Sequence, residues 1–175
     1  MKKTPNLYGF TFIEVIISIA VIFIIISITF AGYARLNQRQ TLISAGQTLK
    51  NILRDAQSRA YTGETDCNIC DCGVGSTSTS LGWYADFSMK EIRGNCGAGN
   101  DFSNKNFGLS NDITISATQN SVPVTKILFR SSPLGVDTPV TVCLSLNLLS
   151  DNYYKITVGP SGEISDSAGL ISACP

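Results

Sequence analysis

The sequence predicts an α+β protein in which a long N-terminal helix packs on an antiparallel β-sheet head. Three observations indicate this class. No charged side chain occurs from Val15 to Ala34. Apolar residues then recur at helical spacing as far as Ala60. After Gly63 the chain changes to short stretches in which polar and apolar residues alternate between turns. A chain of 175 residues suits one domain with an appendage.

The uncharged run is long enough for a helix that crosses a bilayer. At about 1.5 Å per residue, residues 15–34 extend roughly 30 Å, which is the thickness of the hydrocarbon layer. Lys2 and Lys3 precede the run, and Arg35 and Arg39 follow it. The positive leader mildly favours a cytoplasmic N-terminus and an outward-facing C-terminal part. The remaining chain is polar, and with about 115 residues it is large enough to bury its own core.

The helix is expected to continue beyond the apolar run and to end near Tyr61. Apolar residues at spacings of three, four and seven form one stripe that would pack on the head. The stripe comprises Leu36, Leu42, Ile43, Leu49, Ile52, Leu53, Ala56 and Ala60. Gly63 is the expected C-terminal cap, because glycine readily adopts the left-handed conformation that ends many helices.

Glu14 stands at the entrance to the apolar run, and three interpretations of this segment compete. An ordinary secretory signal peptide would be cleaved near 32–34, but its apolar core would be unusually long. A plain signal anchor would leave Glu14 at headgroup depth. In the third interpretation, which we favour, cleavage after Gly9 exposes an α-amine on Phe10. Such an amine has a pKa of about 8, and as a cation it would offset the cost of an acid in lipid. The amine would come from the same or a neighbouring chain.

The segment GFTFIEV after a short basic leader resembles the class III signal of type IV pilins and type II secretion pseudopilins. The resemblance implies a pilin-like fold, cleavage after Gly9 by a prepilin peptidase and N-methylation of Phe10. It also implies that Glu14 neutralises a neighbour's N-terminus during filament assembly. Major pilins often carry a helix-breaking proline in this helix, whereas no proline occurs here between Pro5 and Pro123.

The same resemblance divides the chain into four parts. Residues 1–9 would be the leader peptide, and 10–34 the membrane-spanning and filament-core half of the helix. Residues 35–61 would be the amphipathic half that packs on the head. The β-rich head itself would comprise 62–175 and lie in the periplasm or outside the cell.

Short stretches of alternating polarity predict the strands of the head. The expected strands are 82–88, 112–117, 124–129, 140–146, 153–158 and 162–165. The last two would form a hairpin around a turn at 159–162, which reads Gly-Pro-Ser-Gly. Gly94, Gly97 and Gly99 follow no strand–helix pattern and are expected in a loop.

Residues 127–164 resemble the C-terminal strands of the H-type minor pseudopilins, the GspH/FimT family. The matching positions are Phe129 in a strand, Gly135 in a turn, Val158 at a strand end and Gly162 in the last turn. Certain competence-type members carry arginines around this last glycine and bind DNA with them. Here Glu163 follows it and Asp166 is near, so no nucleic-acid binding is expected.

Six cysteines lie beyond the apolar run, and their even number favours disulfides in an oxidising compartment. They are Cys67, Cys70, Cys72, Cys96, Cys143 and Cys174. The pairing among the first four stays open, and a four-thiolate zinc site is the alternative. Cys143 and Cys174 are expected to tie the C-terminal tail to the sheet. The other bridges are expected to hold a long loop over 64–110.

The composition argues against catalysis and against nucleic acid. The chain contains no histidine, which excludes imidazole bases and His-ligated metals. Lys and Arg balance Asp and Glu at 13 each, so no long-range attraction to nucleic acid arises. No EF-hand spacing occurs, and aspartates within two residues of Asn, Ser or Gly are typical of turns. These are Asp66, Asp71, Asp101, Asp112, Asp151 and Asp166. No enzyme activity, cofactor or metal is expected.

The resemblance therefore indicates a minor pilin or pseudopilin of a type II secretion system or a type IV pilus. It would be a single-pass protein of the bacterial inner membrane with a periplasmic head, and would join a filament after assembly. Its partners would be other pilin or pseudopilin subunits, the prepilin peptidase and the inner-membrane assembly platform. Two alternatives are kept. One is a pilus-tip adhesin that binds through its disulfide-rich loop. The other is a secreted disulfide-rich or thiol-redox domain with an ordinary signal peptide.

Overall fold

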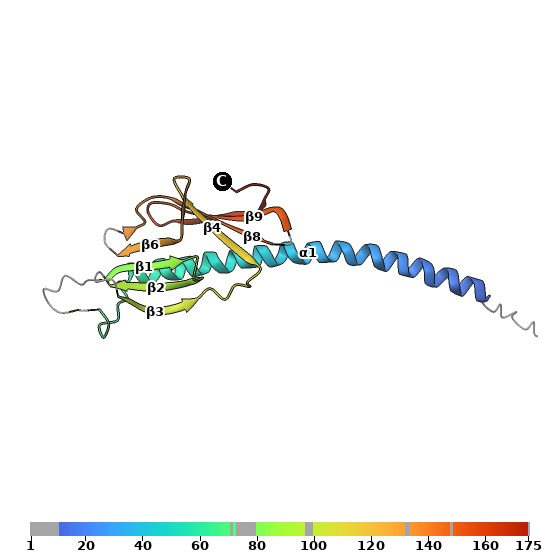
Figure 1. Cartoon of the computed structure of the whole chain (residues 1–175), viewed down its shortest axis with the longest axis horizontal. Coiled ribbons are helices and arrows are strands. Elements are labelled where there is room, and N and C mark those ends of the chain that lie inside the picture. Colours follow the sequence, from blue (N-terminus) through green and yellow to red (C-terminus); the bar gives the residue numbers. More distant parts are fainter. Residues whose placement is uncertain are drawn as a thin grey trace, which may run out of the picture. The chain divides into compact units, whose positions relative to one another are not determined.

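A computed structural model describes residues 11–70, 72, 80–96, 100–131, 134–147 and 149–174. One helix, α1 (Phe12–Tyr61), precedes ten strands within these residues (Figure 1). The chain divides into two compact units that meet between Asn37 and Gln38. The first unit holds the N-terminal half of α1, and the second holds the C-terminal half together with every described strand.

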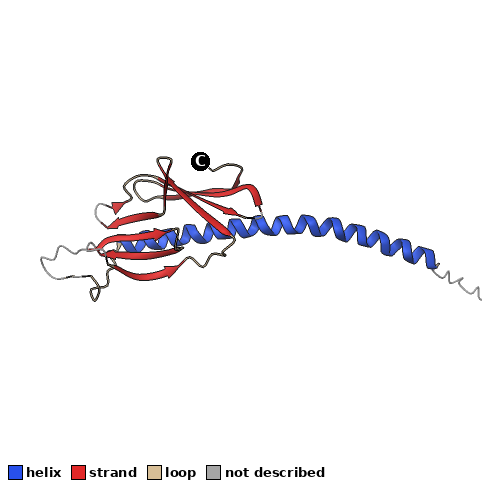
Figure 2. Cartoon of the chain, in the orientation of Figure 1, coloured by secondary structure: helices blue, strands red, loops and turns tan. Residues whose placement is uncertain are grey.

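The strands form two antiparallel five-stranded sheets (Figure 2). The first sheet has the order β3-β2-β1-β6-β7. Its strands are β1 (Ser80–Asp86), β2 (Glu91–Cys96), β3 (Asp101–Asn106), β6 (Lys126–Ser131) and β7 (Leu134–Gly135). The second sheet has the order β10-β9-β8-β4-β5. Its strands are β4 (Ile113–Gln119), β5 (Val122–Val124), β8 (Val140–Leu146), β9 (Leu149–Val158) and β10 (Ile164–Ile171). The α+β class is confirmed, with two sheets in the head where one was expected.

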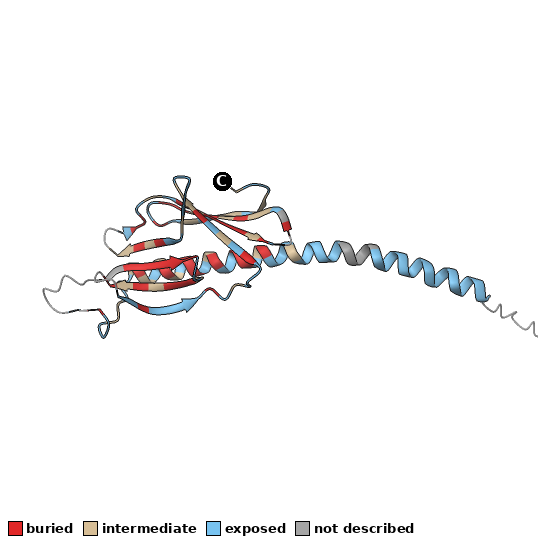
Figure 3. Cartoon of the chain, in the orientation of Figure 1, coloured by how far each residue is buried: buried red, intermediate tan, exposed pale blue. Residues whose placement is uncertain are grey.

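The C-terminal half of α1 supplies one wall of the core of the second unit (Figure 3). Leu42, Leu49 and Leu53 are fully buried there, and Trp83, Phe129 and Ile156 of the strands join them in the same cluster. The predicted stripe is confirmed from Leu42 to Ala60. Leu36 does not belong to it, because Leu36 precedes the second unit and is 53% exposed.

At two glycines, an aromatic ring from a neighbouring strand occupies the space that a side chain on the glycine would need. A Cβ at Gly46 in α1 would overlap the Tyr154 ring of β9, so the ring lies directly on the helix backbone. A Cβ at Gly94 in β2 would likewise overlap the Phe102 ring of β3. Phe102 in turn meets Trp83 edge to face, with ring centroids 5.4 Å apart.

The region 64–110 is not one long loop, which corrects the sequence-based expectation. Strands β1, β2 and β3 lie within it, and Gly94 belongs to β2. Polar residues dominate β2 and β3, so their alternation is weak in the sequence. The packing of Phe102 over Gly94 explains why a glycine stands inside a strand. Gly97 and Gly99 lie outside the described residues.

The end of α1 follows the prediction. The Gly63 amide donates to the Ala60 carbonyl at 3.1 Å, and the Glu64 amide donates to the Arg59 carbonyl at 3.0 Å. Gly63 has a φ of 68°. This pair of hydrogen bonds is the Schellman motif, which satisfies the last free carbonyls of a helix.

The predicted hairpin at the end of the chain is also present, because β9 and β10 pair in an antiparallel register.

Only some of the aspartates that were expected in turns lie in turns. Asp66 caps a turn by accepting a hydrogen bond from the Asn68 amide at 2.9 Å, and Asp112 lies in a turn. Asp101, Asp151 and Asp166 instead lie within strands. Asp71 falls outside the described residues.

Candidate functional site

The N-terminal half of α1 is apolar on every side. Each large apolar side chain described from Phe12 to Ile26 is at least 44% exposed. These residues are Phe12, Ile13, Val15, Ile16, Ile17, Ile19, Val21, Ile22, Phe23, Ile24, Ile25 and Ile26. A helix that is apolar all round needs cover from lipid or from other helices. By length and composition α1 qualifies as a membrane-spanning helix, which makes it a candidate anchor.

Two serines in this apolar half satisfy their hydroxyl groups within the helix. Ser18 Oγ donates to the Glu14 carbonyl at 2.7 Å. Ser27 Oγ donates to the Phe23 carbonyl at 2.8 Å. Bonding to the carbonyl one turn back removes the need for water as a partner. These two hydroxyl groups therefore need no hydrogen bond from water, as is required inside a bilayer.

Glu14 lies in the first turn of α1, and its backbone is held by Thr11. The Glu14 amide donates to the Thr11 carbonyl at 3.1 Å and approaches Thr11 Oγ1 at 3.4 Å. Threonine followed three residues later by glutamate is the spacing of a capping box. An acid at this position is also favoured by the positive end of the helix dipole. The sequence interpretation missed this Thr11–Glu14 spacing. The spacing explains why the helix begins at this point.

The structure leaves the predicted partner of Glu14 undescribed. Gly9 and Phe10, the residues on either side of the predicted cleavage, lie outside the described residues. Glu14 itself is exposed, and within the described part of the chain its carboxylate makes no salt bridge. The carboxylate is therefore accessible to a partner from another molecule.

Three charged or polar groups fasten the C-terminal half of α1 to the second sheet. Lys50 Nζ lies 3.0 Å from Asp166 Oδ2, and the Tyr154 hydroxyl donates to the same carboxylate oxygen. The hydrogen bond from Tyr154, followed by that from Lys50, lowers the pKa of Asp166 below its ordinary value. Burial, followed by the hydrogen bond to Asp166, raises the pKa of Tyr154 to about 12. Asp166 was predicted to lie near a turn, but it is a structural contact between helix and sheet.

The last turn of the chain also docks on the helix. Gln57 Nε2 donates to the Gly162 carbonyl at 2.9 Å, and the Tyr61 hydroxyl donates to the Ser161 carbonyl at 2.7 Å. A Cβ at Gly135 would overlap the Pro160 carbonyl oxygen. Gly135 and Gly162, the two glycines of the H-type resemblance, thus mark one junction of both sheets with α1.

A polar cluster covers part of the first sheet, and sequence reasoning missed it. Arg93 forms ion pairs with Glu91 and, at 3.6 Å, with Asp101. The Tyr84 hydroxyl donates to Asp101 Oδ2. Burial, followed by this hydrogen bond, raises the pKa of Tyr84 to about 12. The alternation of Glu91 and Arg93 along β2, which places both on one face, was the available signal. Two carboxylates share the one guanidinium here, and the contacts link β1, β2 and β3 to one another.

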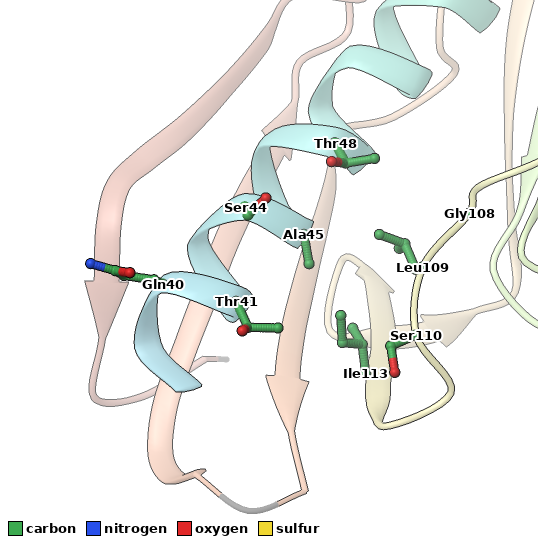
Figure 4. A pocket seen from close by; sticks show the side chains of 9 residues that line it. All are labelled: Gln40, Thr41, Ser44, Ala45, Thr48, Gly108, Leu109, Ser110 and Ile113. Atoms are coloured by element: carbon green, nitrogen blue, oxygen red, sulfur yellow. The ribbon is translucent and has the colours of Figure 1, made fainter. Parts of the chain in front are cut away.

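A groove of about 410 Å³ lies between α1 and the loop before β4 (Figure 4). Its lining carries no charged side chain and consists of Gln40, Thr41, Ser44, Ala45, Thr48, Gly108, Leu109, Ser110 and Ile113. Lys90 Nζ donates to the Ser110 carbonyl of this loop at 3.4 Å and to the Ile113 carbonyl at the start of β4 at 3.0 Å. The described helix wall of this groove is formed by neutral side chains, three of which carry hydroxyl groups.

All six cysteines are paired. The bridges join Cys67 to Cys72, Cys70 to Cys96 and Cys143 to Cys174. The expected link between the tail and the sheet is present, because Cys143 lies in β8. Disulfide formation leaves no thiolates for the four-cysteine zinc alternative. Within the described residues, no group of three or more His, Cys, Asp or Glu side chains is placed to hold a metal ion.

An apolar helix segment that continues into the core of an antiparallel β head defines the pilin fold. Among solved structures, the chain is similar to the type IV minor pilin FimU of Pseudomonas aeruginosa (strain PAO1) in two crystal forms. For the first form the TM-score is 0.53 at 15% identity, covering 80% of this chain and 99% of FimU. For the second the TM-score is 0.50 at 15% identity, covering 77% and 100%. No family model matches the sequence, and no curated protein matches it significantly. The likeness at this identity shows the fold.

Proposed function

We propose that the chain is a minor pilin or pseudopilin of a type IV pilus or a type II secretion system. It polymerises through its N-terminal helix with other pilin or pseudopilin subunits. The observation that carries the proposal is the exposed apolar half of α1, which begins with an accessible acid and continues directly into the core of a pilin-fold head. Lipid covers this half before assembly, and neighbouring helices cover it in the filament.

The division of the chain follows from this role. Residues 1–9 are the leader, removed after Gly9 by a prepilin peptidase that also N-methylates Phe10. Residues 10–34 span the inner membrane and later form the filament core, while 35–61 pack on the head. The head, 62–175, faces the periplasm, and an inner-membrane assembly platform extracts the subunit. Within this scheme the resemblance to the GspH/FimT-type minor pseudopilins supports a low-abundance position near a tip or initiation complex.

Glu14 is assigned the pairing role at assembly. An uncompensated carboxylate in a spanning helix costs about 2.5–3.5 kcal/mol at the bilayer centre and less toward an end. The cationic amine of Phe10 in a neighbouring subunit would neutralise it. The open position of Glu14 in the first turn supports this assignment. The Thr11 cap keeps the helix formed up to that point.

The first test is the start of the mature protein. The chain is co-expressed with a prepilin peptidase in bacterial membranes, purified, and examined by intact mass and N-terminal sequencing. We expect a chain that begins with N-methyl-Phe10. A chain that keeps its first nine residues would refute the proposal, and a chain that begins near Arg35 would favour the ordinary signal peptide.

The second test concerns Glu14 directly. Glu14→Ala and Glu14→Gln are expected to insert and to be cleaved, yet to enter filaments at a small fraction of the wild-type level, because both lose the charge. Glu163→Gln, which removes an exposed acid from the head, is the matched control and is expected to assemble normally. The measurement is the amount of each variant in sheared filaments relative to the membrane pool. Normal incorporation of Glu14→Gln would exclude the pairing role.

A further inference from the structure

The three disulfides differ in how far they are buried. Cys67 and Cys72 are both exposed. Cys70 and Cys96 are 2% and 1% exposed. The third bridge is intermediate, because Cys143 is buried and Cys174 is half-buried. The head therefore carries one bridge on its surface and two that are partly or wholly inside.

Exposure decides which bridge a thiol can attack. Thiol–disulfide exchange requires an incoming thiolate to reach one of the two sulfur atoms, and exposed disulfides are the labile ones. A buried bridge reacts only after the structure around it opens, which slows the reaction by the free energy of that opening. The three bridges also differ in how much each contributes to the stability of the fold. Cys67 and Cys72 are five residues apart, against 26 and 31 for the other pairs, and a shorter loop gains less from its cross-link.

The turn that carries Cys67 is held by contacts other than the Cys67–Cys72 bond. Asp66 Oδ1 accepts a hydrogen bond from the Asn68 amide at 2.9 Å, and the Asp66 carbonyl accepts one from the Cys70 amide at 2.7 Å. Cys70 is in turn bonded to Cys96 in β2. The turn that carries Cys67 is thus held by contacts that remain after the Cys67–Cys72 bond breaks. The two freed thiols stay near each other, at Cα atoms 5.3 Å apart in the bonded form, which favours re-formation.

We propose that the Cys67–Cys72 disulfide is a reversible exchange site for dithiols, which opens while the other two bridges keep the head folded. A thiolate of the dithiol attacks one sulfur atom, the Cys67–Cys72 bond breaks, and a mixed disulfide forms. The released cysteine thiolate takes up a proton. The second thiol of the dithiol then attacks the mixed disulfide, releases the other cysteine and leaves the dithiol oxidised. The chain gains two electrons and two protons. The inference rests on the head alone and is independent of the proposed function.

The test is a timed reduction of the full chain in detergent micelles with limiting dithiothreitol. Free thiols are trapped by alkylation at each time, and the labelled cysteines are identified by peptide mass mapping. Cys67 and Cys72 are expected to be labelled at least about ten-fold faster than the other four, which corresponds to an opening free energy of about 1.4 kcal/mol for the buried bridges. Equal rates for all six, or earlier labelling of Cys143 and Cys174, would overturn the proposal.

Two double variants make the assignment specific. Cys67→Ser with Cys72→Ser is expected to remove the fast phase and to leave Trp83 fluorescence native. Cys143→Ser with Cys174→Ser is the matched control and is expected to keep the fast phase. After dithiothreitol is removed from the wild-type chain and oxidised dithiothreitol is added as the electron acceptor, Cys67 is expected to pair again with Cys72. A persistent fast phase in the first variant, or scrambled pairing on reoxidation, would contradict the inference.

Discussion

The two halves of α1 are one continuous helix by hydrogen bonding, yet they are built for different surroundings. In the half that belongs to the head, Leu42, Leu49 and Leu53 are fully buried. In the first half, side chains of the same kind are at least 44% exposed, on every side of the helix. Helix formation therefore says little about the role of a segment. The pattern of apolar residues, a stripe or an unbroken surface, decides whether the helix is completed by its own chain or by lipid and other molecules.

The largest expected contrast between the halves comes from removing one apolar side chain from each. Leu53→Ala creates a cavity in the head and is expected to lower its free energy of unfolding by about 2–5 kcal/mol. Ile24→Ala, at a 61% exposed position in the first half, is expected to leave head stability unchanged. Denaturant unfolding is followed by the fluorescence of Trp83, the single tryptophan, which is buried in the head. Equal losses in both variants would show that the first half contributes to the stability of the head.

A smaller contrast is expected from the two glycines inside the helix. Gly46→Ala places a methyl group in the Tyr154 ring, so the head is expected to lose about 1–3 kcal/mol through overpacking. Gly32→Ala meets no atom within 4 Å and is expected to raise local helix stability by about 1 kcal/mol. Circular dichroism and Trp83 fluorescence separate the two effects. A Gly46→Ala variant as stable as wild type would mean that the Tyr154 ring moves aside freely.

The smallest of the three effects concerns the ionic contact that only the second half makes. Asp166→Asn is expected to reduce head stability at pH 7 by about 1 kcal/mol, because the bond to Lys50 loses its charge and is partly exposed. The folded-state pKa of Asp166 lies below its ordinary value of 3.8. Its contribution is therefore complete above that pH and is lost as pH falls below it. The variant is expected to show a flatter loss of stability in acid than wild type, measured by urea unfolding at several pH values.

The same contact predicts a change at high pH. The pKa of Tyr154 is raised to about 12 in the folded state, above the ordinary value of 10.0. The unfolded chain therefore ionises first, so stability falls as pH rises from about 10 toward 12. Tyr154→Phe is expected to weaken this alkaline loss without abolishing it, because the pKa of Tyr84 is raised in the same way. An alkaline profile identical to wild type would show that Tyr154 ionises with equal ease when folded.

Local signals predicted much of the architecture. The unbroken apolar run, the stripe from Leu42 to Ala60 and the cap at Gly63 are all properties of neighbouring residues in one helix, and the structure has each of them. The final hairpin was recognisable because its turn is a cluster of glycine and proline between two strands. Such features need no distant partner to be read from the sequence.

The errors arose where distant residues decide the outcome. β2 and β3 consist largely of polar residues, and they are strands because each pairs with a neighbour and because Phe102 packs over Gly94. Asp166 resembles a turn aspartate in the sequence, but it lies in β10. It contacts Tyr154, which is 12 residues earlier, and Lys50, which is more than 100 residues earlier. The missed cluster around Arg93 likewise depends on the registers of β1 and β3.

The sequence by itself determined that this protein has a helix with two kinds of surface, a β-rich head and enough cysteines for three bridges, because each of these depends on composition and short-range periodicity. Tertiary structure alone decided that the head has two sheets, how the first four cysteines pair, and that one bridge is exposed while the other two are partly or wholly buried. These choices depend on contacts between residues far apart in the chain. Such contacts depend on side-chain packing and strand pairing in the folded chain, and no short stretch of sequence shows them.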